Sequence, residues 1–163
     1  MVGVIWTRKN EPILVDVADL EWLSQYGWFL DARGRAVATI KRKPTRMHRL
    51  LLPDSLQVDH INHDPADNRR ANLRAATAAQ NLANRRKWAG CSSAHKGVSW
   101  HVRHKKWQAR ISVNKKRTTL GFFDSEQDAA AAYEAAAQAA YGEFAWSPQD
   151  WGTSQSLLQR YRG

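Results

Sequence analysis

The stretch that decides the fold reads Val58-Asp59-His60-Ile61-Asn62, then Asn68-Arg69-Arg70-Ala71-Asn72-Leu73-Arg74, and then Gln80-Asn81-Leu82-Ala83-Asn84-Arg85. Its first segment predicts a short strand over 58–61, and the polar residues that follow predict a loop over 62–70. A helix is predicted over 77–87, because Thr77 and Gln80 have the spacing of a capping box. This strand, loop and helix carry one carboxylate, one adjacent histidine and two well-spaced asparagines.

These residue types match the needs of phosphodiester hydrolysis. The reaction requires a base that activates water, a cation that stabilises the leaving oxygen, and groups that hold both in place. A neutral imidazole, such as that of His60, has an ordinary pKa near ~6.5 and can take up a proton at physiological pH. Hard oxygen ligands, such as the carboxylate of Asp59, suit Mg²⁺ or Mn²⁺. The segment is therefore a candidate for metal-assisted hydrolysis.

Over residues 45–86 the chain resembles the HNH, or ββα-metal, nucleases of the phage and homing type, and Met47-His48-Arg49-Leu50 and Glu21-Trp22-Leu23 resemble the N-terminal part of that family. The resemblance implies that His60 is the general base. It implies that Asn72 holds the loop and the orientation of His60. It also implies one divalent cation, Mg²⁺ or Mn²⁺, bound by Asp59 and Asn81. Asn81 replaces the final histidine of the motif, which homing-type members tolerate.

The other polar residues of this segment have structural readings. Asn68 is expected to form a turn, and His63 is expected to be a solvated loop histidine. His48 is expected to be a strand histidine that faces the core or DNA. Arg74 and Arg85 are either phosphate contacts or parts of a solvated surface.

The 163-residue chain has a formal net charge of +10, which is unevenly distributed. No Asp or Glu occurs from Asn68 to Phe123, whereas 14 Lys and Arg residues do. A field of one sign over this length suggests a polyanionic partner, and nucleic acid is the commonest. A basic but inert surface is the alternative. We expect double-stranded DNA as the partner.

The cysteine content and the hydropathy of the chain indicate the cellular compartment in which the protein is expected. Cys91 is the only cysteine, which excludes disulfides and cysteine-based zinc sites within one chain. Met1 to Asn10 has no apolar run of the signal-peptide type, and the alanine-rich stretch at 129–140 is too short and interrupted to span a bilayer. We therefore expect a cytoplasmic protein with no membrane partner, and a monomer.

The first half is predicted to be rich in strands. One strand is predicted over 13–17 and another over 47–52, while 28–30 and 36–40 form a hairpin through Arg33-Gly34. A short helix is predicted over 19–26, with Asp19 as its N-cap.

The second half is predicted to form a sheet and one helix. Strands are predicted over 98–102, 107–113 and 117–122. Ser125 starts a helix that ends at Gly142. Period-two alternation places Ala109 and Ile111 on a face that the helix can cover, and Gln108, Arg110 and Ser112 on the opposite face.

Residues 96–146 resemble the Apetala, or ethylene-response-factor, DNA-binding domain, in which a three-stranded sheet lies in the major groove. The resemblance is carried by Lys96-Gly97-Val98-Ser99-Trp100, Lys106-Trp107-Gln108-Ala109-Arg110-Ile111, Leu120-Gly121-Phe122-Phe123, Ala129–Tyr133 and Ala135-Ala136. The family pattern implies that the DNA-facing residues are Ser99, His101, Arg110, Ser112, Arg117 and Thr119. The turn residues expected to contact phosphates are Arg103, Lys105 and Lys116. Four of the DNA-facing positions differ from the usual plant residues, so no base specificity is implied.

These predictions combine into an α+β chain. Residues 1–87 form the HNH-like domain with a β-rich N-terminal extension, 88–95 a linker, 96–146 the sheet domain, and 147–163 a polar tail. The leading hypothesis is a metal-dependent DNA endonuclease that nicks DNA and is targeted by the sheet domain. The alternatives are a non-cleaving DNA-binding protein with a degenerate HNH fold, and an RNA-binding protein. The RNA-binding hypothesis is disfavoured, because the sheet lacks paired exposed aromatics.

Overall fold

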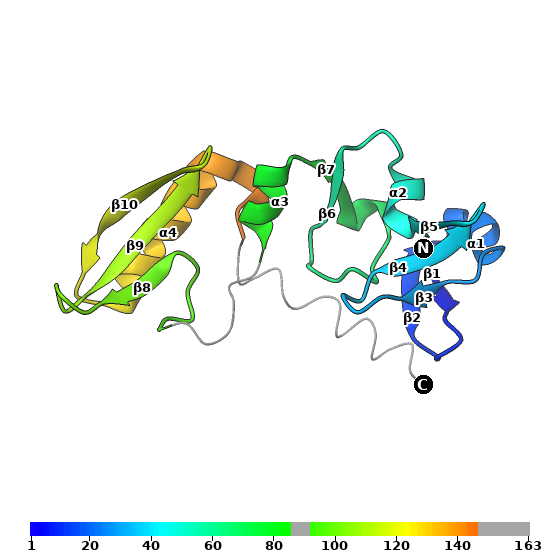
Figure 1. Ribbon diagram of the computed structural model, residues 1–163, viewed down its shortest axis with the longest axis horizontal. Helices are drawn as coiled ribbons and strands as arrows, with labels where there is room; N and C mark the ends of the chain where they lie inside the picture. Colours follow the sequence, from blue (N-terminus) through cyan, green and yellow to red (C-terminus); the bar gives the residue numbers. More distant parts are fainter. Residues whose placement is uncertain (86–91, 147–163) are drawn as a thin grey trace. The chain divides into compact units, whose positions relative to one another are not determined.

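The computed structural model describes residues 1–85 and 92–146 (Figure 1). The chain divides into two compact units, one formed by Met1–Thr77 and the other beginning at Ala78. Residues 88–91 of the predicted linker and all of the predicted tail lie outside the described residues. Small antiparallel sheets and short helices form both units, so the predicted α+β fold is confirmed. No helix in the described ranges is long and apolar enough to cross a membrane.

The first unit consists of small antiparallel sheets and short helices. Its elements are β1 (Val2–Trp6), β2 (Pro12–Asp16), α1 (Val17–Ser24), β3 (Phe29–Leu30), β4 (Ala36–Ile40), β5 (Lys43–Arg46), α2 (Met47–Leu51), β6 (Gln57–His60), the 3₁₀ turn η1 (Arg70–Asn72) and β7 (Leu73–Ala76). β1 pairs with β2, β6 pairs with β7, and β4 lies between β3 and β5. The predicted first strand and the predicted hairpin are confirmed, with ends shifted by at most one residue.

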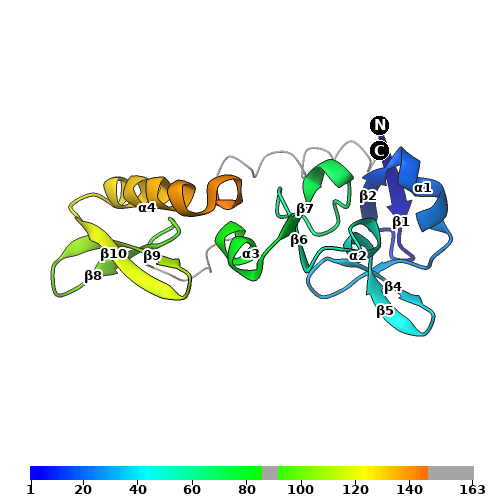
Figure 2. The ribbon, with the colours of Figure 1, turned by 90° about the horizontal axis from the view of Figure 1, so that it is seen from above.

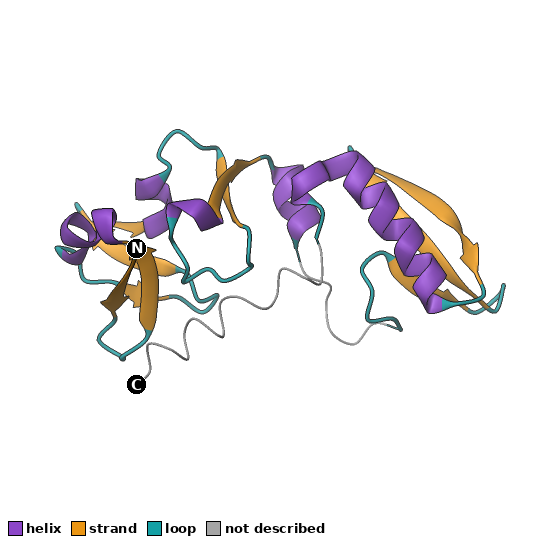
Figure 3. Cartoon of the chain, turned by 180° about the vertical axis from the view of Figure 1, so that it is seen from behind, coloured by secondary structure: helices purple, strands orange, loops and turns teal. Residues whose placement is uncertain are grey.

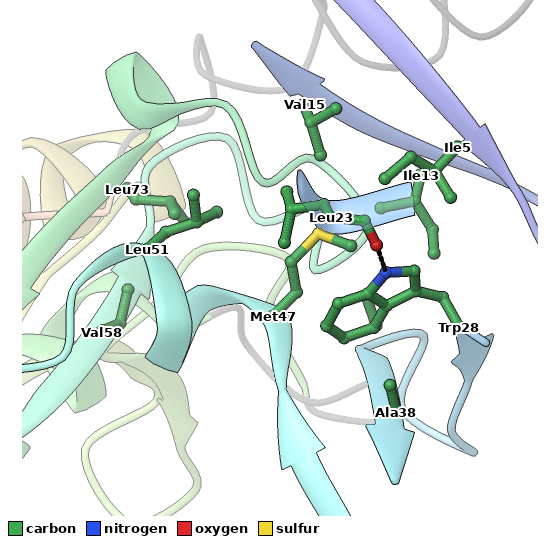
Figure 4. Close-up of a cluster of buried hydrophobic side chains, with 11 residues drawn as sticks. Ile5, Ile13, Val15, Leu23, Trp28, Ala38, Met47, Leu51, Val58 and Leu73 are labelled. Atoms are coloured by element: carbon green, nitrogen blue, oxygen red, sulfur yellow. Dashed lines mark hydrogen bonds between the residues drawn. The ribbon is translucent and has the colours of Figure 1, made fainter. Parts of the chain in front are cut away.

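One hydrophobic core holds the first unit together (Figure 4). Leu23 and Met47 are fully buried, and the indole Nε1 of Trp28 donates a hydrogen bond to the carbonyl oxygen of Leu23 at 2.7 Å. Burying such side chains contributes roughly 1.5–3 kcal/mol each. Val58 of β6 and Leu73 of β7 join the same cluster, so the core fixes the hairpin that carries the HNH-like residues.

The strand predicted over 47–52 is wrong, because these residues form the helix α2. The buried side chains of α2 are Met47, His48 and Leu51, which have helical rather than alternating spacing. A short apolar run does not distinguish a strand from a buried helix by its pattern alone.

The start of α1 also differs from the prediction. The helix begins at Val17, with Asp16 in the N-cap position. Asp19 is not a cap: its carboxylate accepts hydrogen bonds from the indole of Trp22 and from the guanidinium of Arg70, whose Nε is 2.8 Å away. This ion pair joins α1 to η1 across 51 positions of sequence.

In the second unit a helix covers one face of a three-stranded sheet (Figures 2 and 3). Its elements are α3 (Ala78–Asn84), β8 (Val98–His101), β9 (Lys106–Val113), β10 (Lys116–Phe123), α4 (Glu126–Tyr141) and the 3₁₀ turn η2 (Gly142–Phe144). The sheet is antiparallel with the order β10-β9-β8, which confirms the three predicted strands. α3 is confirmed as a helix, although its predicted extension to residue 87 enters residues that the structure does not describe.

Local signals set both ends of α4. The side chain of Ser125 accepts a hydrogen bond from the backbone N–H of Asp128, and Gly142 ends the helix with a φ of 53°. Ala109 packs with Ala129 of α4, in agreement with the predicted covered face of the sheet.

The chain approaches α4 closely just before β8. Gly97 has a φ of 72°, and a Cβ atom at this position would overlap the ring of Tyr133. The neighbouring Lys96 donates hydrogen bonds from Nζ to the carbonyl oxygens of Leu82, Ala83 and Arg85 at and just beyond the end of α3. A lysine at a helix C-terminus satisfies carbonyl groups that have no partner within the helix. Lys96 therefore ties α3 to the segment leading into β8.

Candidate functional site

The β6–β7 hairpin carries the HNH-like acid and histidine. Asp59 is 5% exposed, and it lies opposite Arg74 in the antiparallel register. Arg74 donates from Nε and Nη2 to Oδ2 of Asp59, at 2.9 and 2.8 Å. Arg74, which we considered as a phosphate contact, is therefore held against the predicted metal ligand, and its side chain is only 12% exposed.

His60 lies beside a second histidine from α2. The ring centroids of His48 and His60 are 5.3 Å apart, and the rings are nearly perpendicular. Burial lowers the pKa of His60, while the neighbouring Asn68 side chain and the Asp59 carboxylate act in the opposite direction. Burial, followed by the nearby His60, lowers the pKa of His48 to about 3. Both imidazoles are therefore neutral at neutral pH, and an imidazole in that state can accept a proton.

Asn72 fastens the loop that follows His60. Its Oδ1 accepts a hydrogen bond from the backbone N–H of Asn62 at 3.0 Å, and its Nδ2 donates to the carbonyl oxygen of Asp67 at 2.8 Å. The backbone carbonyl of Asn72 also accepts from the N–H of Ile61, the residue after His60. One side chain thus ties the two ends of the loop together next to the histidine.

The carboxylate of Asp67 also holds the loop together by hydrogen bonds. It is completely buried and accepts hydrogen bonds from the side chains of Asn62 and Arg69. The N–H of Leu14 in β2 donates to the carbonyl of Ala66, while the carbonyl of Leu14 accepts from Asn68. The loop is therefore fixed to a core strand and not merely solvated.

Several of these loop contacts were not predicted. Asn68 was expected only to form a turn, but it is 1% exposed and lies beside His60. His63 has a φ of 61° and is half-buried, so it is not a fully solvated loop histidine. His48 is a core residue, as one alternative proposed, but it lies on a helix. The sequence gave a signal for Asp67, because two arginines, Arg69 and Arg70, lie two and three positions after this acid.

One side chain of this hairpin, Asp59, is of the chemical type that binds a hard divalent cation. Protein sites for Mg²⁺ commonly supply one or two carboxylates, and substrate phosphates and water complete the shell. Asp59 is such a carboxylate, and it would be shared with Arg74. Asn81, the other predicted ligand, lies on α3 in the second unit. Residues 1–85 and 92–146 contain no group of three or more His, Cys, Asp or Glu side chains that could hold a metal.

Four of the predicted DNA-facing residues of the second unit share one face of the sheet. Arg110 pairs with Thr119 and Ser112 pairs with Arg117, on the face opposite α4, and all four are exposed. Ser99 and His101 of β8 are half-buried, and the turn or strand-end cations Arg103, Lys105 and Lys116 are exposed. Arg85 directly follows α3. These positions agree with the predicted division of the sheet into a covered and an open face.

The predicted lack of paired exposed aromatics on the sheet is wrong, because Phe122 is exposed and its ring contacts those of two histidines. The rings of His101, His104 and Phe122 cluster at one end of the sheet, with centroid distances of 4.5–5.1 Å. Trp107 is half-buried against the α4 side, and the centroid of its ring lies 5.2 Å from that of the exposed Trp100. The aromatic cluster depends on the pairing register of the strands, which brings Phe122 of β10 beside His101 of β8.

Comparison with known proteins identifies relatives of the chain. A family model described as HNH endonuclease matches residues 48–83. The chain is also 30% identical, over 131 residues, to an uncharacterized HNH endonuclease of Acanthamoeba polyphaga mimivirus, and this match covers 76% of the chain and 67% of the viral protein. No solved structure matches the chain. The family match includes Asp59, His60, Asn72 and Asn81.

Proposed function

The chain belongs to the HNH endonuclease family, and we propose on that premise that it hydrolyses phosphodiester bonds of double-stranded DNA with one divalent cation, Mg²⁺ or Mn²⁺. The observation that carries the proposal is the Asp59–His60 pair on β6, next to a loop that Asn72 holds closed. One centre of this kind per chain favours nicking of one strand.

His60 is proposed as the general base. Its lowered pKa keeps the imidazole neutral at physiological pH, so it can take a proton from the attacking water. His48 packs against its ring and limits the orientations that the imidazole can adopt. The water, once deprotonated, attacks the phosphorus atom.

Asn72 is proposed as a positioning residue. It does not need to touch the substrate, because its hydrogen bonds to Asn62 and Asp67 fix the backbone on both sides of the loop. A displacement of about 1 Å at a catalytic group can cost on the order of 10²-fold in rate.

Asp59 and Asn81 are proposed to hold the divalent cation. A bound cation of this type stabilises the developing charge on the leaving 3′ oxygen. Arg74 orients the Asp59 carboxylate and compensates its buried charge.

The second unit is proposed to target the nuclease, with the open face of its sheet in the major groove, as in Apetala-type domains. An antiparallel ribbon fits that groove, and arginines such as Arg110 and Arg117 can bind guanine by paired hydrogen bonds. The match to the viral endonuclease also supports a joint role, since its 131 aligned residues exceed the 77 residues of the segment Met1–Thr77.

Incubation with supercoiled plasmid tests the proposal. With Mg²⁺ or Mn²⁺ the full chain should convert supercoiled plasmid to the nicked form before linear product appears. EDTA should stop the reaction, and Asp59→Asn should slow it and raise the metal concentration required. Plasmid binding without any nicking in either metal would favour a non-cleaving DNA-binding protein instead.

A further inference from the structure

A second acid-free segment lies in the first unit. From Ala32 to Pro53 there is no Asp or Glu, whereas seven Lys and Arg residues occur. Three of these are consecutive, Lys41-Arg42-Lys43, and form the tip of the β4–β5 hairpin, which projects from the rest of the unit (Figure 2). All three are exposed, and among the described residues none of them forms an ion pair.

The backbone at this tip has positive φ angles, which lysine and arginine rarely adopt. Ile40 pairs with Lys43, so Lys41 and Arg42 form a two-residue turn, with φ of 48° and 65°. Such a turn favours Asn-Gly, because both of its residues need positive φ. The β9–β10 turn has the same geometry and places Asn114 in its first position. Two long cations at the β4–β5 turn therefore cost stability, both through the backbone and through mutual repulsion.

The hairpin is connected directly to the candidate active site. β5 ends at Arg46 and α2 begins at the next residue, so the hairpin leads into the helix whose His48 contacts His60. Arg35, Arg46 and Arg49 lie close enough to His48 to contribute to lowering its pKa. Three arginines in and around the hairpin and α2 therefore lie near His48, and one of them, Arg35, is paired with Asp31.

We propose that the β4–β5 hairpin is a second DNA-binding element, whose tip binds backbone phosphates of the duplex near the bond that is cut. This inference rests on the proposed nuclease function for its location, and on the charge and geometry of the tip for its partner. A projecting two-stranded ribbon with lysine and arginine at its tip presents point charges and planar donors to phosphate oxygens. The contact is with the DNA backbone, so it increases affinity and orients the protein on the duplex but gives no preference for a base.

The test compares two pairs of turn cations in the same unit. Lys41→Asn/Arg42→Gly removes the tip charges and installs residues that suit the turn. Arg8→Ala/Lys9→Ala removes two exposed charges from the β1–β2 turn and serves as the matched control. Affinity of the full chain for duplex DNA is measured in EDTA over a range of salt concentrations, so that binding is recorded without cleavage.

The tip variant should bind on the order of 10- to 100-fold more weakly at low salt, and its salt slope should be shallower by about two, since each lost phosphate contact contributes about 0.9. The control should keep the wild-type slope. The melting temperature of the tip variant should equal or exceed that of wild type. Lys43→Gln, a single change on the strand, should reduce the slope by about one.

The proposal is overturned if the tip variant and Lys43→Gln keep the wild-type salt slope. It is also overturned if the control loses as much DNA affinity as the tip variant. A loss of affinity for duplex RNA without a loss for duplex DNA would overturn it as well. Cleavage is scored separately: the tip variant should raise KM and leave kcat unchanged. A chain that binds DNA through the tip but never cuts would contradict the nuclease proposal alone.

Discussion

Asn72 shows how one residue connects loop structure to chemistry. Asn72→Ala removes a donor and an acceptor from a buried loop. We expect a loss of about 1–3 kcal/mol of stability. We also expect kcat for DNA cleavage to fall by on the order of 10²-fold while KM changes little. Asn10→Gly, at an exposed turn with a φ of 59°, is the control and should leave kcat unchanged. A rise in KM with normal kcat would contradict the positioning role.

At the residue scale, the sequence was informative where the partners are near in the chain or fixed by a motif. The spacing of Asp59, His60 and Asn72 predicted a strand followed by a loop, and the structure places Asp59 and His60 on β6 and Asn72 in η1. The ion pair between Asp59 and Arg74 was not predicted, because it depends on the register of β6 against β7. The burial of Asn68 was missed because it arises from β2, which is distant in sequence.

Asp31 supplies a pH-dependent prediction. The guanidinium of Arg35, at 2.6 Å, is the main cause that lowers the Asp31 pKa to about 2. Since the folded pKa lies below the unfolded value, the contribution to stability is present above about pH 4 and is lost as pH falls through 2. Asp31→Asn should therefore lower the free energy of unfolding at pH 6, by at most about 2 kcal/mol, and have little effect below pH 2. An equal loss at both pH values in urea titrations would refute this explanation.

Elements with local signals were predicted well, and elements defined by distant partners were not. The three strands of the second unit were predicted because alternation and turns specify them locally. β1, β5 and β7 were missed. β7 reads Leu73-Arg74-Ala75-Ala76, which has weak strand preference and is held by pairing with β6. α2 was misassigned because its apolar run is too short to show a period.

The junction between β8 and α4 gives a prediction at the element scale. Gly97→Ala places a methyl group against the ring of Tyr133, on a backbone with positive φ. We expect destabilisation of about 2–4 kcal/mol, from overlap and backbone strain together. Gly27→Ala is the matched control, because a Cβ there has no atom within 4 Å. Thermal unfolding of both variants measures the difference, and equal melting temperatures would show that the close approach is unimportant.

At the scale of the whole molecule, the sheet of β8, β9 and β10 is expected to recognise the DNA sequence, while β6, β7 and α3 carry the proposed chemistry. Arg110→Ala or Arg117→Ala, on the open face, should cost about 1–3 kcal/mol for the preferred sequence and relax the preference at one base. Lys105→Ala or Lys116→Ala should weaken all sequences alike and make the salt slope shallower by about one. Competition binding with a randomised duplex library distinguishes these outcomes. If each of the four variants bound all DNA sequences more weakly by the same factor, the sheet would contact only phosphates.

The central claim is that His60 acts as the general base of a metal-dependent DNA nuclease. The most direct measurement is the single-turnover rate of plasmid nicking by His60→Ala in Mg²⁺, with DNA affinity measured in parallel. We expect a rate lower by on the order of 10²–10⁴-fold, unchanged affinity for DNA, and partial recovery of the rate with added imidazole. Nicking by His60→Ala at the wild-type rate would contradict the claim.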